Sequence, residues 1–108
     1  MSDKIDLLDN TFTNVSLGTG YSGYCRYKII GKLCFVQMVA TASNYTFSST
    51  WTRFIVLPKA KNGMYHYNYN TKGSLLGWYI DSTGVLQVQV KSGANTNDLN
   101  CDFFYEIA

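Results

Sequence analysis

The sequence predicts an all-β protein, a small antiparallel β-sandwich of jelly-roll-like form with about eight strands. Short apolar stretches alternate with turn-forming stretches along the whole chain, and no segment keeps apolar residues at the 3.6-residue period of a substantial helix. Residues 33–40 are apolar on both faces, as expected of a strand that is covered twice. Because an open sheet would expose its edges, this many short strands in 108 residues favour two packed sheets.

The N-terminal half contains the first three strand candidates. Residues 1–10 form a lead or shaft-proximal segment with at most one helical turn, and residues 11–108 form the head domain. Strands are expected at 11–17, 24–30 and 32–42. In the second, Cys25, Tyr27 and Ile29 alternate with polar residues, and Gly31 with Lys32 provides a tight corner into the third.

The C-terminal half contains five further candidates, at 51–57, 64–69, 74–81, 85–90 and 101–107. The loops between them are rich in Gly, Asn, Asp and Ser, the residues that turns require. Strand 85–90 has the clearest pattern, with Leu86, Val88 and Val90 predicted to face inward and Gln87 and Gln89 outward.

Composition excludes several classes of protein. Apolar residues make up 46% of the chain, which excludes a disordered polypeptide, and nine basic and seven acidic residues are scattered without a basic stripe for nucleic acid. The chain has neither the apolar core of a signal peptide nor a membrane span, so we expect assembly in the cytoplasm without membrane insertion. Three cysteines are expected to be buried free thiols that suit a reducing compartment, with pairing of Cys25 and Cys34 left open.

The order of several short motifs resembles the C-terminal receptor-binding head, or tip, of bacteriophage tail-fibre and baseplate proteins. The motifs are the strand and corner from Arg26 to Lys32, the stretch from Phe54 to Pro58, the hairpin from Ile80 to Leu86, and the aromatic final strand from Phe103 to Ile107. The resemblance covers roughly residues 20–108. The chain has Lys59 to Gly63 where the family usually has a Gly-Tyr-Arg-Pro segment, so any role of that segment is not carried over.

The resemblance implies a homotrimeric knob on the virion that recognises a bacterial cell-surface receptor, with saccharide as the expected ligand. A strand with two apolar faces also allows a subunit interface, and the candidates for it are Cys34, Val36, Met38 and Ala40. Burial of the same four side chains within their own chain is the alternative.

Candidate ligand-binding residues lie on the strand 64–69. Alternation places Tyr65, Tyr67 and Tyr69 on one face, with His66 and Asn68 on the other. Aromatic rings and amide or imidazole groups suit saccharides, but burial explains the alternation of the tyrosines without a ligand and is the favoured interpretation. His66, the only histidine, is interpreted as a surface residue in reach of ligand.

Two loops add weaker candidates. Trp51 begins its strand beside a polar loop, where its indole serves either as a stacking platform or as a lid on one end of the sandwich. Asn97 and Asp98 belong to an Asn-rich loop that lacks the ligand pattern of a calcium site, so we expect a solvated loop and neither metal nor cofactor.

Catalysis is not expected. Asp102 and Glu106 are four residues apart on one strand, about 13 Å, too far for the carboxylate pair of a glycosidase. Two alternatives to a receptor-binding tip remain: a purely structural virion knob that trimerises, and a stand-alone carbohydrate-binding module.

Overall fold

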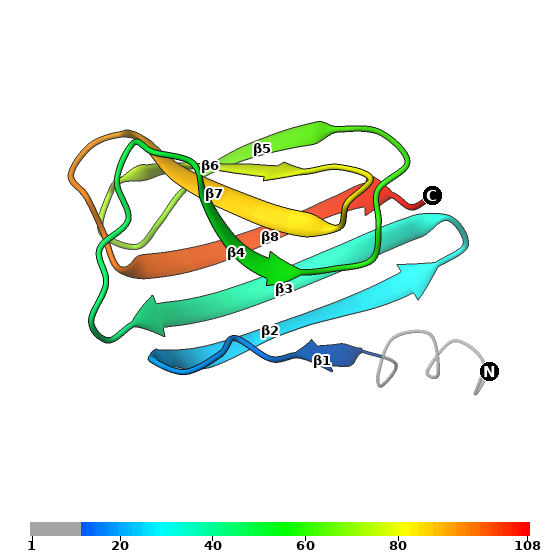
Figure 1. Cartoon of the computed structure of the whole chain (residues 1–108), viewed down its shortest axis with the longest axis horizontal. Helices are drawn as coiled ribbons and strands as arrows, with labels where there is room; N and C mark the ends of the chain where they lie inside the picture. The colour runs from blue at the N-terminus through cyan, green and yellow to red at the C-terminus, as the bar shows by residue number, and fades with distance from the viewer. Residues whose placement is uncertain (1–11) are drawn as a thin grey trace.

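The computed structural model describes residues 12–108 and confirms the all-β prediction. Eight strands form two four-stranded antiparallel sheets that face each other across a common core (Figure 1). Each of the eight predicted strands overlaps an observed one. The proposed lead segment, residues 1–10, lies outside the described residues.

The two sheets differ in their connections. Sheet I has the order β1-β2-β3-β8 and contains β1 (Thr13–Val15), β2 (Tyr21–Ile30), β3 (Leu33–Ala42) and β8 (Asp98–Glu106). Sheet II has the order β4-β7-β6-β5 and contains β4 (Thr52–Val56), β5 (Met64–Tyr69), β6 (Leu75–Ile80) and β7 (Val85–Ser92). Since β5, β6 and β7 follow one another and β4 returns beside β7, sheet II is a Greek key, the unit from which jelly rolls are built.

The corner between β2 and β3 has the predicted form. Ile30 pairs with Leu33, which leaves Gly31 and Lys32 as a two-residue turn. Gly31 has a φ of 62°, and no residue other than glycine has a positive φ in residues 12–108. A positive φ at the first turn position alone defines a type II′ turn, where glycine is preferred because it has no Cβ to clash.

The core lies between the sheets, and the long strands β3, β7 and β8 contribute alternate side chains to it. Its largest fully buried members are Trp78, Phe47, Met38, Leu76, Ile80 and Leu86. Burial of an aliphatic or aromatic side chain contributes about 1.5–3 kcal/mol, so this layer supplies the main driving force for folding. The prediction that Leu86, Val88 and Val90 face inward is confirmed.

The residues expected at a subunit interface belong to this core. Cys34, Val36, Met38 and Ala40 are at most 1% exposed, because β3 directs them toward sheet II of the same chain. Their assignment to an oligomer interface was therefore wrong, and the alternative of burial within their own chain is correct. The other face of β3, which contains Phe35 and Val39, remains partly accessible to solvent.

All three cysteines are buried free thiols, as predicted. Cys25 lies opposite Met38 and Cys34 lies opposite Ile29, so the two are separated by four residues along the paired strands, about 13 Å. A disulfide needs its Cα atoms within about 7 Å, so this pair does not bridge in the folded chain. Burial raises the pKa of Cys25 to about 12 and also raises the pKa values of Cys34 and Cys101.

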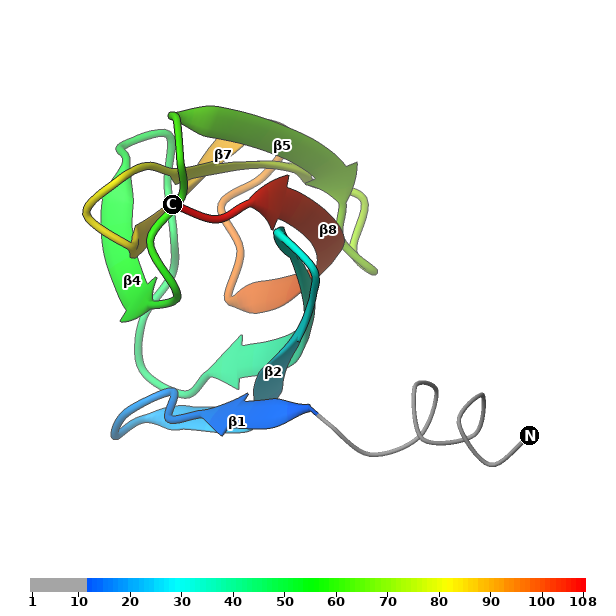
Figure 2. The ribbon, with the colours of Figure 1, turned by 90° about the vertical axis from the view of Figure 1, so that its right-hand side faces the viewer.

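The edges of the two sheets meet along one side of the sandwich. Figure 2 shows β5, the last strand of sheet II, beside β8, the last strand of sheet I. Strand β5 thus has one face turned toward β8 and the other face turned away from the molecule, and the candidate functional residues are divided between these two faces.

Candidate ligand-binding surfaces

A cluster of two exposed and two half-buried aromatic rings covers part of the outer face of sheet II. This aromatic surface consists of Trp51, Tyr65, Tyr67 and Tyr79. The ring centroids of Tyr65 and Tyr79 are 4.7 Å apart, and Trp51 lies 6.0 Å from Tyr65 and 6.3 Å from Tyr79. Tyr65 and Tyr67 have nearly parallel rings, with an interplanar angle of 7° and centroids 6.5 Å apart.

The tyrosines of β5 are therefore not core residues, contrary to the favoured interpretation of their alternation. Tyr65, Tyr67 and Tyr69 are 58%, 46% and 66% exposed. The reason is that β5 is an edge strand whose alternate residues, His66 and Asn68, are directed toward β8 instead. Tyr69 lies at the end of β5, outside the aromatic surface.

A glycine lies beneath the ring of Tyr67. Gly77 is the partner of Tyr67 across β5 and β6, and a Cβ atom at Gly77 would lie 3.0 Å from Cε1 of Tyr67. The missing side chain thus leaves room for the ring to lie against the sheet, a pairing of aromatic and glycine that stabilises strands. The next residue across the sheet is Gln89, whose Nε2 donates a hydrogen bond of 2.8 Å to the carbonyl oxygen of Ser49.

On the opposite face of β5, amide side chains tie the two sheets together. Asn68 Oδ1 accepts a hydrogen bond of 2.8 Å from Nε1 of buried Trp78, and Asn68 Nδ2 donates one of 2.7 Å to the carbonyl oxygen of Asn100 on β8. Two residues after Asn68, Asn70 Nδ2 donates a hydrogen bond of 3.0 Å to the carbonyl oxygen of Asp98. We call these contacts the amide seam. They satisfy main-chain oxygens on the edge of β8, which would otherwise be open to another strand.

His66 occupies the next position in the same row. Its imidazole stacks on Phe103 with centroids 5.3 Å apart, and its buried Nε2 has no hydrogen-bond partner in the described part of the chain, residues 12–108. Burial lowers the pKa of His66, and the opposing effect of the Asp102 carboxylate is smaller. The imidazole is therefore neutral near pH 7, and His66 is a partly buried residue rather than the surface residue expected.

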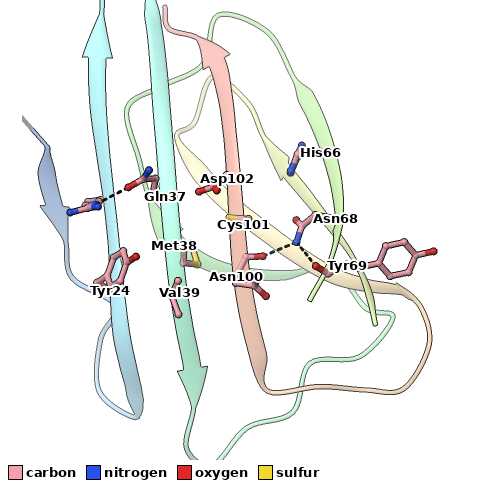
Figure 3. A pocket seen from close by; sticks show the side chains of 11 residues that line it. Tyr24, Gln37, Met38, Val39, His66, Asn68, Tyr69, Asn100, Cys101 and Asp102 are labelled. Carbon is pink, nitrogen blue, oxygen red and sulfur yellow. Dashed lines mark hydrogen bonds between the residues drawn. The ribbon is translucent and has the colours of Figure 1, made fainter. Parts of the chain in front are cut away.

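A groove lies where β5 flanks the outer face of sheet I. This polar groove has a volume of about 510 Å³. Figure 3 shows Gln37 and Val39 of β3 on one side, Asn100 and Asp102 of β8 in the middle, and His66 and Asn68 of β5 on the other side, while the ring of Tyr69 points away.

Charged and aromatic groups of β2 complete the polar groove. Arg26 Nε donates a hydrogen bond of 3.0 Å to Gln37 Oε1, and the guanidinium lies 5.2 Å from the ring centroid of Tyr24 and 4.6 Å from that of Phe12. These contacts fix the guanidinium beside the groove. Asn100 and His66 line the groove, and the buried atoms Asn100 Oδ1 and His66 Nε2 have no hydrogen-bond partner among residues 12–108. No local sequence pattern indicates this groove, because its residues come from four separate strands.

The two loop candidates have structural contacts. Asn97 Nδ2 donates to the carbonyl oxygen of Ala42 at 2.9 Å, and the carboxylate of Asp98 accepts hydrogen bonds from the main chain and hydroxyl of Thr71. Both residues thus fix the loop between β7 and β8 and lie outside the aromatic surface and the polar groove. No group of three or more potential metal-ligating side chains occurs within residues 12–108.

Of the two expected roles of Trp51, the structure argues against the lid, and the stacking platform stays a prediction. Its ring contacts Tyr65 and Tyr79 on the outer face of sheet II, so it extends the aromatic surface and does not close an end of the sandwich. Trp78 is 1% exposed, which confirms the prediction that it belongs to the core.

Comparison with known proteins does not assign the chain to a family. Residues 12–108 contain no helix that is long and apolar enough to cross a membrane. No protein-family model, curated protein or solved structure matches this chain.

Proposed function

We propose that this protein is a receptor-binding head domain that recognises a saccharide on the bacterial cell surface through its aromatic surface. The observation that carries the proposal is the exposure of Tyr65 and Tyr67 on an edge strand, with the half-buried rings of Trp51 and Tyr79 packed beside Tyr65. A domain that only folds does not need such rings in water, whereas exposed aromatic clusters mark binding sites.

The chemistry of the aromatic surface suits sugars. The C–H faces of a pyranose pack against aromatic rings, and its hydroxyl groups need hydrogen-bonding partners at the edge of those rings. The tyrosine hydroxyls and the neighbouring amides of Gln87 and Gln89 can supply them. Because the rings are held against one another, binding costs little side-chain entropy.

The biological setting of the proposal comes from the sequence motifs. Their resemblance to phage tail-fibre and baseplate tips supports a place on the virion, as a homotrimer assembled in the cytoplasm of the bacterial host. Three buried free thiols are compatible with such assembly. Several copies on one particle would increase the overall avidity for the cell surface, because after the first weak contact the other sites meet sugar at a high effective concentration.

The test is glycan binding with variants of the aromatic surface. The protein is displayed in multiple copies on beads and applied to immobilised bacterial surface polysaccharides. We expect Trp51→Ala and Tyr67→Ala each to reduce retention up to about tenfold, since the loss of a stacked ring costs about 0.5–1.5 kcal/mol. Tyr45→Ala is the matched control, because Tyr45 is similarly exposed but packs on Phe47 away from the aromatic surface. Retention of both variants at the level of the unmodified protein would refute the proposal.

A second candidate function is supported by an apolar area at one end of the outer face of sheet I. Ile30, Leu33 and Phe104 are exposed there, and Phe104 packs against Phe35 with centroids 5.5 Å apart. This area suits a second copy of the chain, as in a structural knob that trimerises. Light scattering after size exclusion tests it: a mass near three times 12.2 kDa that Phe104→Ser reduces supports self-association through this area. A monomer at high concentration favours a stand-alone carbohydrate-binding module.

A further inference from the structure

We propose that the polar groove is a second ligand-binding site, separate from the aromatic surface, and that it binds a neutral sugar at the end of a saccharide chain. The groove lies over the outer face of sheet I, and the aromatic surface lies on the outer face of sheet II. The inference therefore does not depend on the proposed function of the aromatic surface.

The size and construction of the groove fit a small ligand. Its volume of about 510 Å³ falls within the range of roughly 300–1,000 Å³ typical of ligand sites. The groove is built on strands β2, β3, β5 and β8, so its side chains are held by main-chain pairing instead of by a loop. Arg26 is further fixed by its hydrogen bond to Gln37 and its contact with Tyr24.

Two residues that line the groove each have a buried polar atom without a hydrogen-bond partner in residues 12–108. These atoms are Nε2 of His66 and Oδ1 of Asn100, from strands on the two sides of the sheet junction. Buried polar atoms in folded proteins nearly always have a hydrogen-bond partner, and an atom without one calls for an ordered water or a ligand. The side chain of Asn68 is not a free partner for these atoms or for a ligand, because its amide already bonds Trp78 and the main chain of Asn100.

The balance of charge in the groove defines the class of ligand. Arg26 presents a positive charge and Asp102 a negative charge on the same face. The carboxylate of Asp102 repels an anion such as phosphate, and the guanidinium of Arg26 repels a cation, so both charged classes of ligand bind unfavourably. Hydroxyl groups both donate and accept, so one polyhydroxyl ligand can pair with Asp102, Asn100 and Arg26 together. The ring of Tyr24 and the side chain of Val39 offer apolar contact to the C–H face of a sugar.

Nuclear magnetic resonance of the ¹⁵N-labelled full chain tests the inference. The probes are methyl glycosides of glucose, galactose, mannose and N-acetylglucosamine, added to millimolar concentration, where single-sugar sites are detected. At least one is expected to shift the side-chain amide signals of Asn100 and Gln37. Asp102→Ala should weaken that binding about tenfold, as expected for loss of a hydrogen bond to a charged group.

Matched variants separate this site from the aromatic surface. Glu106→Ala removes another exposed carboxylate from the same face of β8, outside the groove, and should leave binding unchanged. Trp51→Ala should also leave the groove signals unchanged. If groove shifts persist in Trp51→Ala while polysaccharide retention by the beads does not depend on Trp51, the groove inference holds and the proposed function of the aromatic surface fails.

Three results would overturn the groove inference. The first is the absence of shifts at Asn100 and Gln37 with every glycoside. The second is equal binding by Asp102→Ala and the unmodified protein, provided that the variant keeps its dispersed spectrum. The third is preferential binding of phosphate or of a basic dipeptide at these residues, which would contradict the neutral ligand.

Discussion

Replacement of Asn68 by alanine should destabilise the protein far more than its place on an edge strand suggests. The side chain connects the two sheets through its hydrogen bonds to Trp78 Nε1 and to the carbonyl oxygen of Asn100. Asn68→Ala removes at once the acceptor of the Trp78 indole N–H and the donor to the Asn100 carbonyl oxygen. Trp78 is 1% exposed in the unmodified protein, so its Nε1–H depends on Asn68 as its hydrogen-bond partner.

The expected cost follows from the two groups left unpaired. A buried donor or acceptor without a partner costs about 1–3 kcal/mol. The indole N–H is the fully buried one, whereas the Asn100 carbonyl lies at a sheet edge and can recover some hydration, so we expect about 2–4 kcal/mol in total. Since domains of this size have about 5–15 kcal/mol of stability, the variant loses a substantial part of it.

Urea unfolding followed by far-ultraviolet circular dichroism measures this cost, and a double-mutant cycle identifies its source. Trp78→Phe removes the donor while keeping a ring in the core, so it should cost less in the Asn68→Ala background than in the unmodified chain. Asn95→Ala on an exposed loop is the control and should change stability by less than about 0.5 kcal/mol. A cost below about 0.5 kcal/mol for Asn68→Ala, or additive effects of the two substitutions, would refute the reasoning.

Three further predictions concern Gly77, His66 and the thiols. Gly77→Ala places a Cβ against Tyr67 and should displace that ring, which weakens glycan retention several-fold while the core stays unchanged. The ring-proton chemical shifts of Tyr67 measure the displacement, and unaltered shifts would contradict the contact. Burial lowers the pKa of His66 below the 6.5 of its unfolded form, so the free energy of unfolding should be highest above pH 6.5 and decline as the pH falls toward the folded pKa. His66→Gln should abolish this decline in urea titrations between pH 7 and 5. An unchanged decline in this variant would assign the pH dependence to another group. None of the three buried thiols should react with a disulfide reagent at pH 8 until denaturant is added, and rapid labelling of the native protein would show that the core opens.

The fold was predictable because its signals are local. The alternation of strand 85–90 and the Gly31 corner each follow from residues adjacent in sequence, and both are confirmed. Strand ends were less predictable. The segment from Gly18 to Gly23 has the composition of a turn, yet β2 begins at Tyr21, because pairing with β3 extends to the Tyr21 and Ala42 pair.

The candidate site was only partly predictable because it depends on which strand lies at an edge. The alternation of Tyr65, Tyr67 and Tyr69 identified two faces correctly but could not indicate which face meets water. That choice is made by β8, whose main-chain oxygens attract Asn68 and Asn70. The polar groove was missed for a related reason: Arg26, Gln37 and Asp102 are far apart in sequence and become neighbours only through the register of β2, β3 and β8.

The two-sided character of β5 has a consequence for how such a domain can diversify. Positions 66, 68 and 70 hold the sheets together, so selection for folding restricts them. Positions 65, 67 and 69 face solvent, and changes there leave the amide seam untouched. A lineage under pressure to recognise new surfaces can therefore exchange every second residue of this strand freely, while the intervening residues preserve the architecture that presents them.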